Sequence, residues 1–418
     1  MKIAILTSGF LPVVDGVTVT VWHRVKGLSD RGHQVRLFCP DYEPLATLYP
    51  NWKDFVGEIF PGVRVIPLPS TPFMGIAFER NISAQAYPQL LQELEAFQPD
   101  LIHVDEPDRL LLGFDRVPAV DYARAHQIPC VGFFHTDFLG YMEDYLPLPK
   151  VLVAPLQAIA KRFITQKSFN AYDVTLVSSA ATYRKVQAIG ITNAVQGEFL
   201  GIDLSRFSPE LRQPQFWQQQ YGLPDLSQKI KLAFLGRLTP DKGWDFTLKA
   251  FSKLAKRRDC SDLALLIAGD GGLRSPIQHH FQKLGISAYF LGRISPDQVP
   301  AFFANSDLHL TTSQRETRGL TVLEAFAAGL PVLAPSAGGV VDSIRDRQNG
   351  LLFPPNDIPI FLTQLETLLD QPELRQKLGA QAQQEAQAYG LDAAIDRLIA
   401  LWQEYLHSPD TKKRLANP

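Results

Sequence analysis

Two carboxylates, Glu316 and Glu324, lie eight positions apart on either side of a glycine, within the segment Ser313–Gly329. Apolar residues recur at helical spacing after Gly319, so we expect this glycine where a short buried strand leads into a helix. The N-terminus of a helix offers unpaired N–H groups and the positive end of the dipole, which can hold a phosphate or the hydroxyls of a sugar. Glu316 would face such a ligand from the preceding loop, and Glu324 would lie about one turn inside the helix. On spacing alone, two solvated glutamates beside an ordinary helix start are the simpler alternative.

Two cations follow another apolar run, Leu232–Leu235, as Gly236-Arg237 and then Lys242-Gly243. Arginine is a two-pronged donor and lysine is a point charge, and together they suit a diphosphate group at the end of a strand. Solvated surface charges are the alternative at this position.

Two weaker signals lie in the first half of the chain. Gly16 follows the first apolar run at the start of a helical pattern, where a glycine lets the backbone approach a ligand closely. A plain turn is an equal alternative there. His135 follows the run Gly132–Phe134, a position at which a histidine is most often structural. The first loop lacks the pattern G-x-G-x-x-G, so a dinucleotide fingerprint is absent.

Short apolar runs alternate with amphipathic segments, which predicts parallel strands joined by helical crossovers and hence doubly wound α/β sheets. Residues 201–228, rich in Pro, Gln, Ser and charge, are predicted to cross between two such sheets. Ligands of these sheets bind beyond the carboxyl ends of the strands, where the motifs above fall. The expected strands are Ile3–Leu6, Val35–Phe38, Val63–Leu68, Leu101–Val104, Cys130–Phe134 and Val174–Val177, then Leu232–Leu235, Leu263–Ala268, Tyr289–Leu291, Leu308–Leu310, Val332–Ala334 and Leu351–Phe353.

Composition narrows the class of protein. A chain of 418 residues is long enough for two α/β domains with separate cores. The net charge of −2 gives no basic field that would attract nucleic acid. The three cysteines lack metal-binding or disulfide spacing, which favours a reducing cytoplasm. No stretch approaches the roughly 20 apolar residues that a membrane span requires, so we expect a soluble or peripheral protein.

The pattern S-x-x-E-x-x-G at Ser313–Gly319, followed by L-E-A-F-A-A-G-L-P-V, resembles the signature of the family 4 retaining glycosyltransferases. The pattern G-R-L-x-x-x-K-G at Gly236–Gly243 is similar to the one with which that family holds a nucleotide diphosphate. The resemblance implies the GT-B fold, in which two Rossmann-like domains face each other across a cleft. It places an acceptor domain at residues 1–205, a donor domain at 206–389, and a C-terminal helix at 390–407 that packs back on the first domain.

The resemblance also implies roles for individual residues. Arg237 and Lys242 would hold the diphosphate, Glu316 would orient the donor, and His135 would hydrogen-bond a sugar hydroxyl; these four are the expected catalytic residues. Glu324 would bind the ribose hydroxyls. Asp270 is equally suited to cap a helix, and Arg318 stands where the family often has an apolar or aromatic residue. The further positions expected to contact the donor are Gly16, Gly236, Gly269, Asp270, Arg293, Ile294, Thr317, Arg318, Gly319 and Leu320.

The activity implied by the resemblance is transfer of a sugar, with retention, from a UDP-sugar or GDP-mannose to an acceptor hydroxyl. No cofactor is expected, and the absence of a D-x-D motif predicts no essential metal. A nucleotide-sugar epimerase is one alternative, although it would need further carboxylates. A non-catalytic GT-B scaffold that binds a glycan is another, although loss of Glu316, Arg237 or Lys242 would then be expected.

The motif Asp15-Gly16-Val17 suggests the acceptor. It resembles the motif found in a branch of the family that includes sulfoquinovosyl-diacylglycerol synthases and α-mannosyltransferases. This implies a lipid or lipid-linked glycan, met by a cytoplasmic protein at the inner face of the membrane; a water-soluble acceptor is the alternative. Two apolar segments, Pro69–Phe78 and Phe138–Pro155, are interpreted as loops that could contact a bilayer, with core packing equally compatible. Residues 1–205 hold 17 Lys and Arg against 21 Asp and Glu, a net charge of −4, which opposes broad attraction to anionic lipid.

Overall fold

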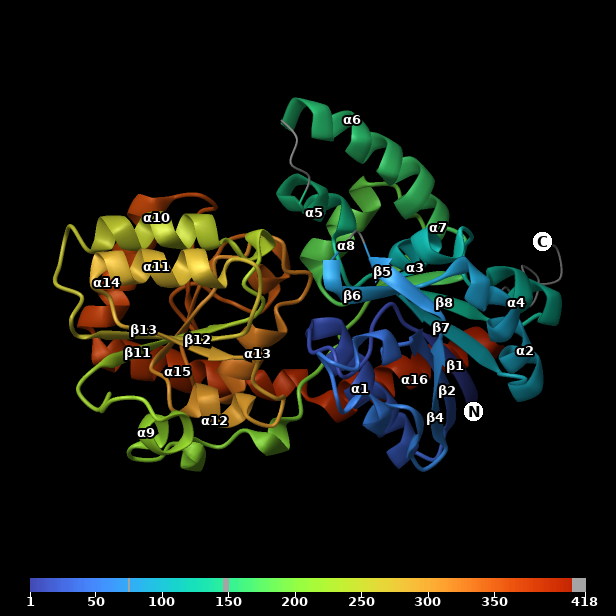
Figure 1. The fold of residues 1–418 in the computed structure, drawn as a ribbon, viewed down its shortest axis with the longest axis horizontal. Helices are drawn as coiled ribbons and strands as arrows, with labels where there is room; N and C mark the ends of the chain where they lie inside the picture. Colours follow the sequence, from blue (N-terminus) through green and yellow to red (C-terminus); the bar gives the residue numbers. More distant parts are fainter. Residues whose placement is uncertain (74–75, 146–149, 408–418) are drawn as a thin grey trace. The chain divides into compact units, whose positions relative to one another are not determined.

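The computed structural model describes residues 1–73, 76–145 and 150–407 (Figure 1). The chain forms two α/β units, one made of Met1–Gly201 together with the chain from Asp392 onward, and the other of Ile202–Leu391. The family resemblance implied domains at residues 1–205 and 206–389. The observed boundaries, at Gly201/Ile202 and Leu391/Asp392, lie within a few residues of these positions. The predicted helix from residue 390 begins at Leu391, because Gly390 has an extended backbone.

The first unit is built on an eight-stranded sheet in the order β10-β9-β8-β7-β1-β2-β4-β3. Its strands are parallel except β3, which pairs antiparallel with β4 at the edge. The order reverses between β1 and β7, and a reversal of this kind opens a crevice for ligands at the carboxyl ends of the strands. The strands are β1 (Lys2–Leu6), β2 (Gln34–Pro40), β3 (Gly57–Phe60), β4 (Val63–Leu68), β7 (Leu101–Asp105), β8 (Cys130–Phe133), β9 (Val174–Val177) and β10 (Ala194–Gln196).

Helices connect these strands, as expected for parallel pairing. None of the helices in the described part of the chain is both long and apolar enough to span a bilayer. The helices are α1 (Gly16–Asp30), α2 (Tyr87–Phe97), α3 (Pro107–Phe114), α4 (Val120–His126), α5 (Phe138–Tyr145), α6 (Lys150–Ala160), the π-helix η4 (Lys161–Gln166), α7 (Lys167–Phe169), α8 (Ala180–Ala188) and α16 (Leu391–His407).

The C-terminal helix α16 packs on the first unit, as the sequence predicted. Its Trp402 is fully buried with its ring against that of His103 in β7, the two centroids 5.4 Å apart. Ile395 packs so closely on Gly27 of α1 that a Cβ at that glycine would lie 2.2 Å from it. Arg31 adds ion pairs to Asp392 at 3.0 Å and Asp396 at 2.7 Å. The apolar stripe of α16 is therefore part of the first unit's core.

The two apolar segments that the sequence placed in loops have regular structure instead. Ser70–Phe73 (β5) and Ile76–Ile82 (β6) form a two-stranded antiparallel sheet, with Ser70 opposite Ile82. Phe138–Pro155 lies in α5 and α6, apart from residues 146–149, which, like Met74 and Gly75, are outside the described residues. Apolar residues at helical spacing in the second segment favoured a helix, so the interpretation of both segments as loops was wrong.

The second unit contains a six-stranded parallel sheet in the order β13-β12-β11-β14-β15-β16, which reverses between β11 and β14. Every strand of this sheet was predicted to within two residues at each end. The elements are β11 (Ile230–Leu235), α10 (Trp244–Leu254), β12 (Leu263–Ala268), α11 (Arg274–Leu284), β13 (Ala288–Gly292), α12 (Val299–Ala304), β14 (Leu308–Leu310), α13 (Leu320–Ala327), β15 (Val332–Pro335), β16 (Leu351–Phe353), α14 (Ile358–Asp370) and α15 (Pro372–Ala386).

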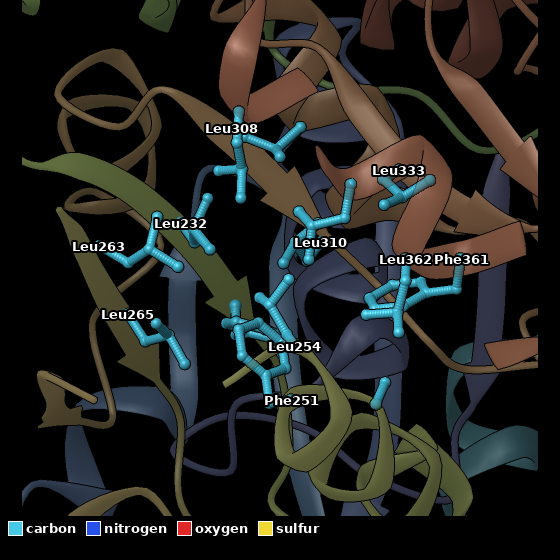
Figure 2. Packing of buried hydrophobic residues seen from close by; sticks show 14 of the residues in the cluster. Leu232, Phe251, Leu254, Leu263, Leu265, Leu308, Leu310, Leu333, Phe361 and Leu362 are labelled. Atoms are coloured by element: carbon cyan, nitrogen blue, oxygen red, sulfur yellow. The ribbon is translucent and has the colours of Figure 1, made fainter. Parts of the chain in front are cut away.

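Alternate strand residues point to opposite faces of this sheet, and each face has its own core. Helices α10, α11 and α14 cover one face and α12, α13 and α15 cover the other. Figure 2 shows the first core, in which leucines of four strands meet residues of α10 and α14: Leu232, Leu263, Leu265, Leu308, Leu310 and Leu333 with Phe251, Leu254, Phe361 and Leu362. Burial on both faces explains the nearly continuous apolar runs that made these strands recognisable in the sequence.

Residues 201–228, predicted as a crossing between domains, belong to the second unit from Ile202 onward. Phe216 and Trp217 of α9 (Phe216–Tyr221) are buried in its second core. The indole Nε1 of Trp217 donates to the carbonyl oxygen of Asn305 at 3.0 Å. The chain therefore changes unit at the start of this segment, between Gly201 and Ile202, and the rest of the segment is anchored by buried aromatic residues despite its polar composition.

Candidate functional site

The second unit gathers the predicted catalytic cations and carboxylate at the reversal point of its sheet. Arg237 and Lys242 follow β11, and Glu316 follows the neighbouring strand β14. Nζ of Lys242 donates to Oε1 of Glu316 at 2.7 Å. Asp241, whose side chain is fully buried, lies 3.5 Å from Nη2 of Arg237 and 3.9 Å from Nζ of Lys242. Residues far apart in the chain therefore form one polar cluster where ligands of such sheets bind.

The charge state of Glu316 follows from this cluster. Burial alone would raise the pKa of its carboxyl, but the charge and hydrogen bond of Lys242, with a hydrogen bond from Ser313, lower the pKa below its ordinary value. The carboxylate is thus ionised at neutral pH and ready to accept hydrogen bonds from hydroxyls of a ligand.

Close backbone contacts hold the loops around this cluster. A Cβ at Gly269, after β12, would lie 1.8 Å from the carbonyl oxygen of Gly236, after β11. A Cβ at Gly339 would lie 2.0 Å from the carbonyl oxygen of Thr317, and the N–H of Gly339 donates to the carbonyl oxygen of Glu316 at 2.6 Å. Only glycine allows this approach, so these glycines fix the loops that present Arg237 and Glu316.

Helix α13 begins where the sequence predicted. Gly319 is its N-cap in the left-handed conformation, with φ of 77°, and Leu320 is its first residue. No side chain caps the N–H groups of this first turn. Glu324, partly buried one turn further on, has its pKa raised by burial from an ordinary 4.5 to about 7, with the charge of Arg206 opposing the rise. The helix start therefore combines open N–H donors with a carboxyl that titrates near neutrality.

Three further predicted residues follow the adjacent strands. Asp270, exposed after β12, accepts from the N–H of Gly271 at 2.9 Å. It does not cap a helix, since α11 begins only at Arg274 with Leu273 as its N-cap. Arg293 is exposed after β13, and Ile294 beside it is buried in the second core. Asp270 and Arg293 thus extend the edge on which Arg237 lies.

Arg318 has a different position from the one expected of a donor contact. It is 2% exposed, and its Nη1 donates to Oγ of Ser343 at 3.1 Å. Its guanidinium lies over the ring of Tyr389, 4.7 Å from the centroid. These contacts are with the interior, so Arg318 supports the loop before α13, and its prediction as a donor contact finds no support in this geometry.

The first unit has a polar pocket at the reversal point of its own sheet, between β1 and β7. Gly16 starts α1 beside this pocket, but Oδ1 of Asp15 already accepts from the N–H groups of Val17 and Thr18, at 2.9 Å each. The helix start predicted to approach a phosphate is therefore capped by a carboxylate of the chain itself. The pocket is lined by Ser8, Gly9, Val13, Asp15, Val17, Tyr42, Glu79, Arg80, Glu106 and Arg109.

Charges in this pocket are balanced by partners. Nη2 of Arg109 lies 3.2 Å from a carboxylate oxygen of Glu79, and its guanidinium covers the ring of Phe73. Nε of Arg80 donates to Oγ of Ser70 at 3.0 Å. Glu106 accepts from the hydroxyls of Ser8 and Thr136. Glu79, Glu106, Arg80 and Arg109 of this pocket therefore already have polar partners within the chain.

His135 is held by a buried network that sequence reasoning missed. Its Nε2 donates to Oδ1 of Asp105 at 2.6 Å, and Nη1 of Arg24 donates to the same carboxylate at 2.9 Å. Burial opposes ionisation of Asp105, but the charge of Arg24 and the contact with His135 hold its pKa well below the ordinary value. Burial and Arg24 lower the pKa of His103 to about 4, so His103 is neutral and accepts from Arg24 at 2.8 Å. The only signal in the sequence was an acidic residue at the end of a buried strand.

No group of His, Cys, Asp and Glu among the described residues has an arrangement suited to a metal ion.

Comparisons with known proteins identify the family of the chain. The model of glycosyltransferase family 4 matches residues 14–206, and the model of glycosyl transferases group 1 matches residues 216–385. The chain is 31% identical to the sulfoquinovosyl transferase SQD2 of Arabidopsis thaliana over 82% of its own length, and spans 64% of that protein. It is 30% identical to a GDP-mannose-dependent alpha-mannosyltransferase of Mycolicibacterium smegmatis, covering 97% of this chain and 98% of the other.

Two more comparisons concern a lipid-related enzyme and the fold. The alpha-monoglucosyldiacylglycerol synthase of Streptococcus pneumoniae is 25% identical over 84% of this chain and 75% of its own length. The sucrose-phosphate synthase of Thermosynechococcus elongatus superposes with a TM-score of 0.74 at 18% identity, over 96% of this chain and 98% of that one. Two units with Rossmann-like sheets, together with these relatives, identify the chain as a GT-B protein that belongs to glycosyltransferase family 4.

Proposed function

We propose that the protein transfers a sugar, with retention of anomeric configuration, from a nucleoside diphosphate sugar to an acceptor hydroxyl. The observation that supports this most directly is the contact of Lys242 with Glu316 at the reversal point of the second sheet, with Arg237 beside them. Two cations and a helix N-terminus suit a diphosphate leaving group, and an ionised carboxylate suits the hydroxyls of a sugar.

In this proposal Arg237 and Lys242 stabilise the negative charge that develops on the leaving diphosphate, and the first turn of α13 adds its open N–H groups. Glu316 orients the donor sugar, and Glu324 accepts from the ribose hydroxyls. His135 donates to or accepts from a sugar hydroxyl, with its ring fixed by Asp105. Attack on the same face within an ion pair needs positioned reactants rather than a covalent nucleophile, which explains why we assign none.

We propose further that no divalent metal is required. In many sugar-nucleotide enzymes a metal neutralises the diphosphate. Here Arg237 and Lys242 supply two fixed positive charges at the same place, and the dipole of α13 has the same sign.

For the acceptor we propose a neutral hydroxyl of a membrane lipid or lipid-linked glycan. The relative named for monoglucosyldiacylglycerol synthesis supports a lipid, and the polar partners that Glu106 and Arg109 already have within the chain are compatible with a neutral hydroxyl. Phe73 does not serve as a membrane contact in this proposal, because its ring lies under the guanidinium of Arg109.

The test measures nucleoside diphosphate release from UDP-sugars and GDP-mannose, with and without a lipid extract, and determines the anomeric configuration of the product by NMR. Thermal shift with UDP, GDP and ADP identifies the base independently of turnover. Acceptor-dependent release with a retained configuration is the expected result. Conversion of the donor sugar without transfer would instead identify an epimerase, and glycan binding without any turnover would identify a scaffold.

A further inference from the structure

Helix α6 and the π-helix η4 that continues it expose an apolar stripe to solvent. Leu152, Leu156, Ile159 and Phe163 are 52%, 40%, 57% and 61% exposed. Their spacing of four, three and four residues places them along one side of a helix. Half of the large hydrophobic side chains that are strongly exposed in the described residues therefore lie in this one stripe. Isolated exposed apolar residues are ordinary, but a contiguous row is characteristic of a binding surface.

An adjoining side of the same helices, about a quarter turn round from the exposed row, anchors them to the first unit. Val153 and Ala160 are buried, at 2% and 5% exposure, as are Thr165 and Ser168 further along. A surface helix normally turns its apolar side inward and its polar side to water. Here apolar residues lie on both the anchoring side and the exposed side, so the outward row is not needed to hold α6 in place.

The charged residues of this segment have one sign, although α5, which packs on α6, carries Glu143 and Asp144. The twenty residues Lys150–Phe169 contain four cations, Lys150, Lys161, Arg162 and Lys167, and no Asp or Glu. The guanidinium of Arg162 lies 5.8 Å from the ring centroid of Phe163, so a cation adjoins the apolar row directly. Arg162 and Lys167 are exposed. An apolar row flanked by cations without carboxylates is the pattern with which helices bind an anionic membrane surface.

We infer that the row Leu152, Leu156, Ile159 and Phe163 docks on an anionic lipid bilayer, its apolar side chains entering the interface and Arg162 and Lys167 meeting lipid phosphates. The inference rests on the proposed function, which places the acceptor hydroxyl in a membrane lipid. A protein partner would need carboxylates placed to match Arg162 and Lys167, whereas an anionic bilayer offers an apolar interior and phosphates all along the row. The net negative charge of residues 1–205 makes the attraction local to this segment.

The decisive experiment is flotation of the full-length protein with vesicles of phosphatidylcholine alone or with phosphatidylglycerol added. Wild type is expected to float with the anionic vesicles and to be released by salt. Leu156→Ser/Ile159→Ser/Phe163→Ser should lower the bound fraction about tenfold or more, and Arg162→Gln/Lys167→Gln should remove the preference for phosphatidylglycerol. The matched control Leu112→Ser/Ile360→Ser changes side chains of similar exposure, 39% each, on other surfaces, and should float as wild type does.

Two further measurements make each result conclusive. Circular dichroism and thermal unfolding test whether the triple variant folds. We expect it to fold as wild type does, because the side chains replaced are exposed. Transfer to a short-chain acceptor dispersed without vesicles should be unchanged in the triple variant, so a failure of docking is distinguishable from a failure of the proposed function. Equal flotation of wild type and triple variant would overturn the inference, as would light scattering that shows a dimer abolished by the same substitutions, since a second copy would then be the occupant.

Discussion

Nζ of Lys242 lies 2.7 Å from Oε1 of Glu316, although the two residues follow different strands and are separated by 74 positions in the chain. The strands, β11 and β14, are neighbours at the point where the order of the second sheet reverses. The contact therefore couples a cation suited to a leaving diphosphate with a carboxylate suited to sugar hydroxyls before any donor is bound, which is the preorganisation that electrostatic catalysis requires.

Glu316→Gln should lower kcat by roughly 10²–10³, because it removes an ionised group that is proposed to orient the donor while it preserves the shape of the side chain. Steady-state release of nucleoside diphosphate measures the effect. Glu210→Gln, on an exposed part of the same unit, is the matched control. Turnover close to wild type in the Glu316 variant would remove it from the catalytic residues.

Arg237→Ala and Lys242→Ala should each weaken binding of the free nucleoside diphosphate as well as turnover, because both cations are proposed to contact the diphosphate itself. We expect a kcat lower by roughly 10²–10³ for each. Calorimetric titration with the nucleotide identified by thermal shift gives the binding effect, and Lys253→Ala on the exposed side of α10 serves as control. Unchanged nucleotide affinity in both variants would contradict the proposed diphosphate site.

The pKa of about 7 for Glu324 predicts two effects of pH. Only its ionised form accepts from both ribose hydroxyls, so the donor KM should rise as the pH falls below 7, and Glu324→Gln should make KM nearly independent of pH. The folded state holds the proton of the Glu324 carboxyl more tightly than the unfolded state does. The free energy of unfolding should therefore fall as the pH rises from about 4.5 towards 7, and it should stay at the lower value above pH 7. The variant should therefore unfold at a higher temperature than wild type at pH 8, by no more than the equivalent of about 3 kcal/mol. A KM that is flat with pH in wild type would contradict the assignment.

Asp105→Asn should destabilise the first unit by about 3–5 kcal/mol, because the guanidinium of Arg24 would remain buried without its counter-charge. Urea unfolding measures the loss, with the exposed Asp115→Asn as control. The ionised Asp105 stabilises the folded state at pH values above the ordinary pKa of an aspartate, and this stabilisation is lost as the pH falls through the lowered pKa of the folded state. The difference in free energy of unfolding between wild type and variant should therefore narrow in acid. A variant as stable as wild type at pH 7 would show that the network around His135 is not important for folding.

Treatment with EDTA should leave the transfer rate essentially unchanged, because Arg237, Lys242 and the start of α13 are proposed to neutralise the diphosphate. Addition of Mg²⁺ or Mn²⁺ to the treated enzyme should have no effect either. Loss of activity that either ion restores would show that these charges do not suffice.

The strands of the second sheet, and β1, β2, β4, β7, β8 and β9 of the first, could be predicted because burial on both faces of a parallel sheet makes each of them an almost unbroken apolar run. The edge strands β3 and β10, none of whose residues is buried, were not predicted, and neither were β5 and β6. The residues after those strands could be predicted as well, since parallel strands bring their carboxyl ends to one edge. Leu308–Leu310, for example, was found as a strand of three residues with Glu316 beyond it.

Contacts made by side chains in the middle of helices could not be predicted in the same way. Arg24 lies within α1 and looks like any polar residue of a helix until the fold brings Asp105 against it. Arg318 likewise lies beside the motif residues, but its direction towards Tyr389 depends on a segment that the chain adds much later. Composition also did not reveal that most of residues 201–228 is anchored in the second unit, because a few buried aromatic residues such as Trp217 outweigh many polar neighbours.

The return of α16 to the first unit has a consequence for synthesis on the ribosome. Domains generally fold in the order in which they are translated. Here the surface around His103 stays uncovered until Trp402 has left the ribosome, by which time every residue of Ile202–Leu391 has already emerged. The unit encoded first is thus the one completed last, and a nascent chain interrupted after Leu391 carries the whole second unit joined to a first unit that lacks α16 and exposes the surface that this helix covers.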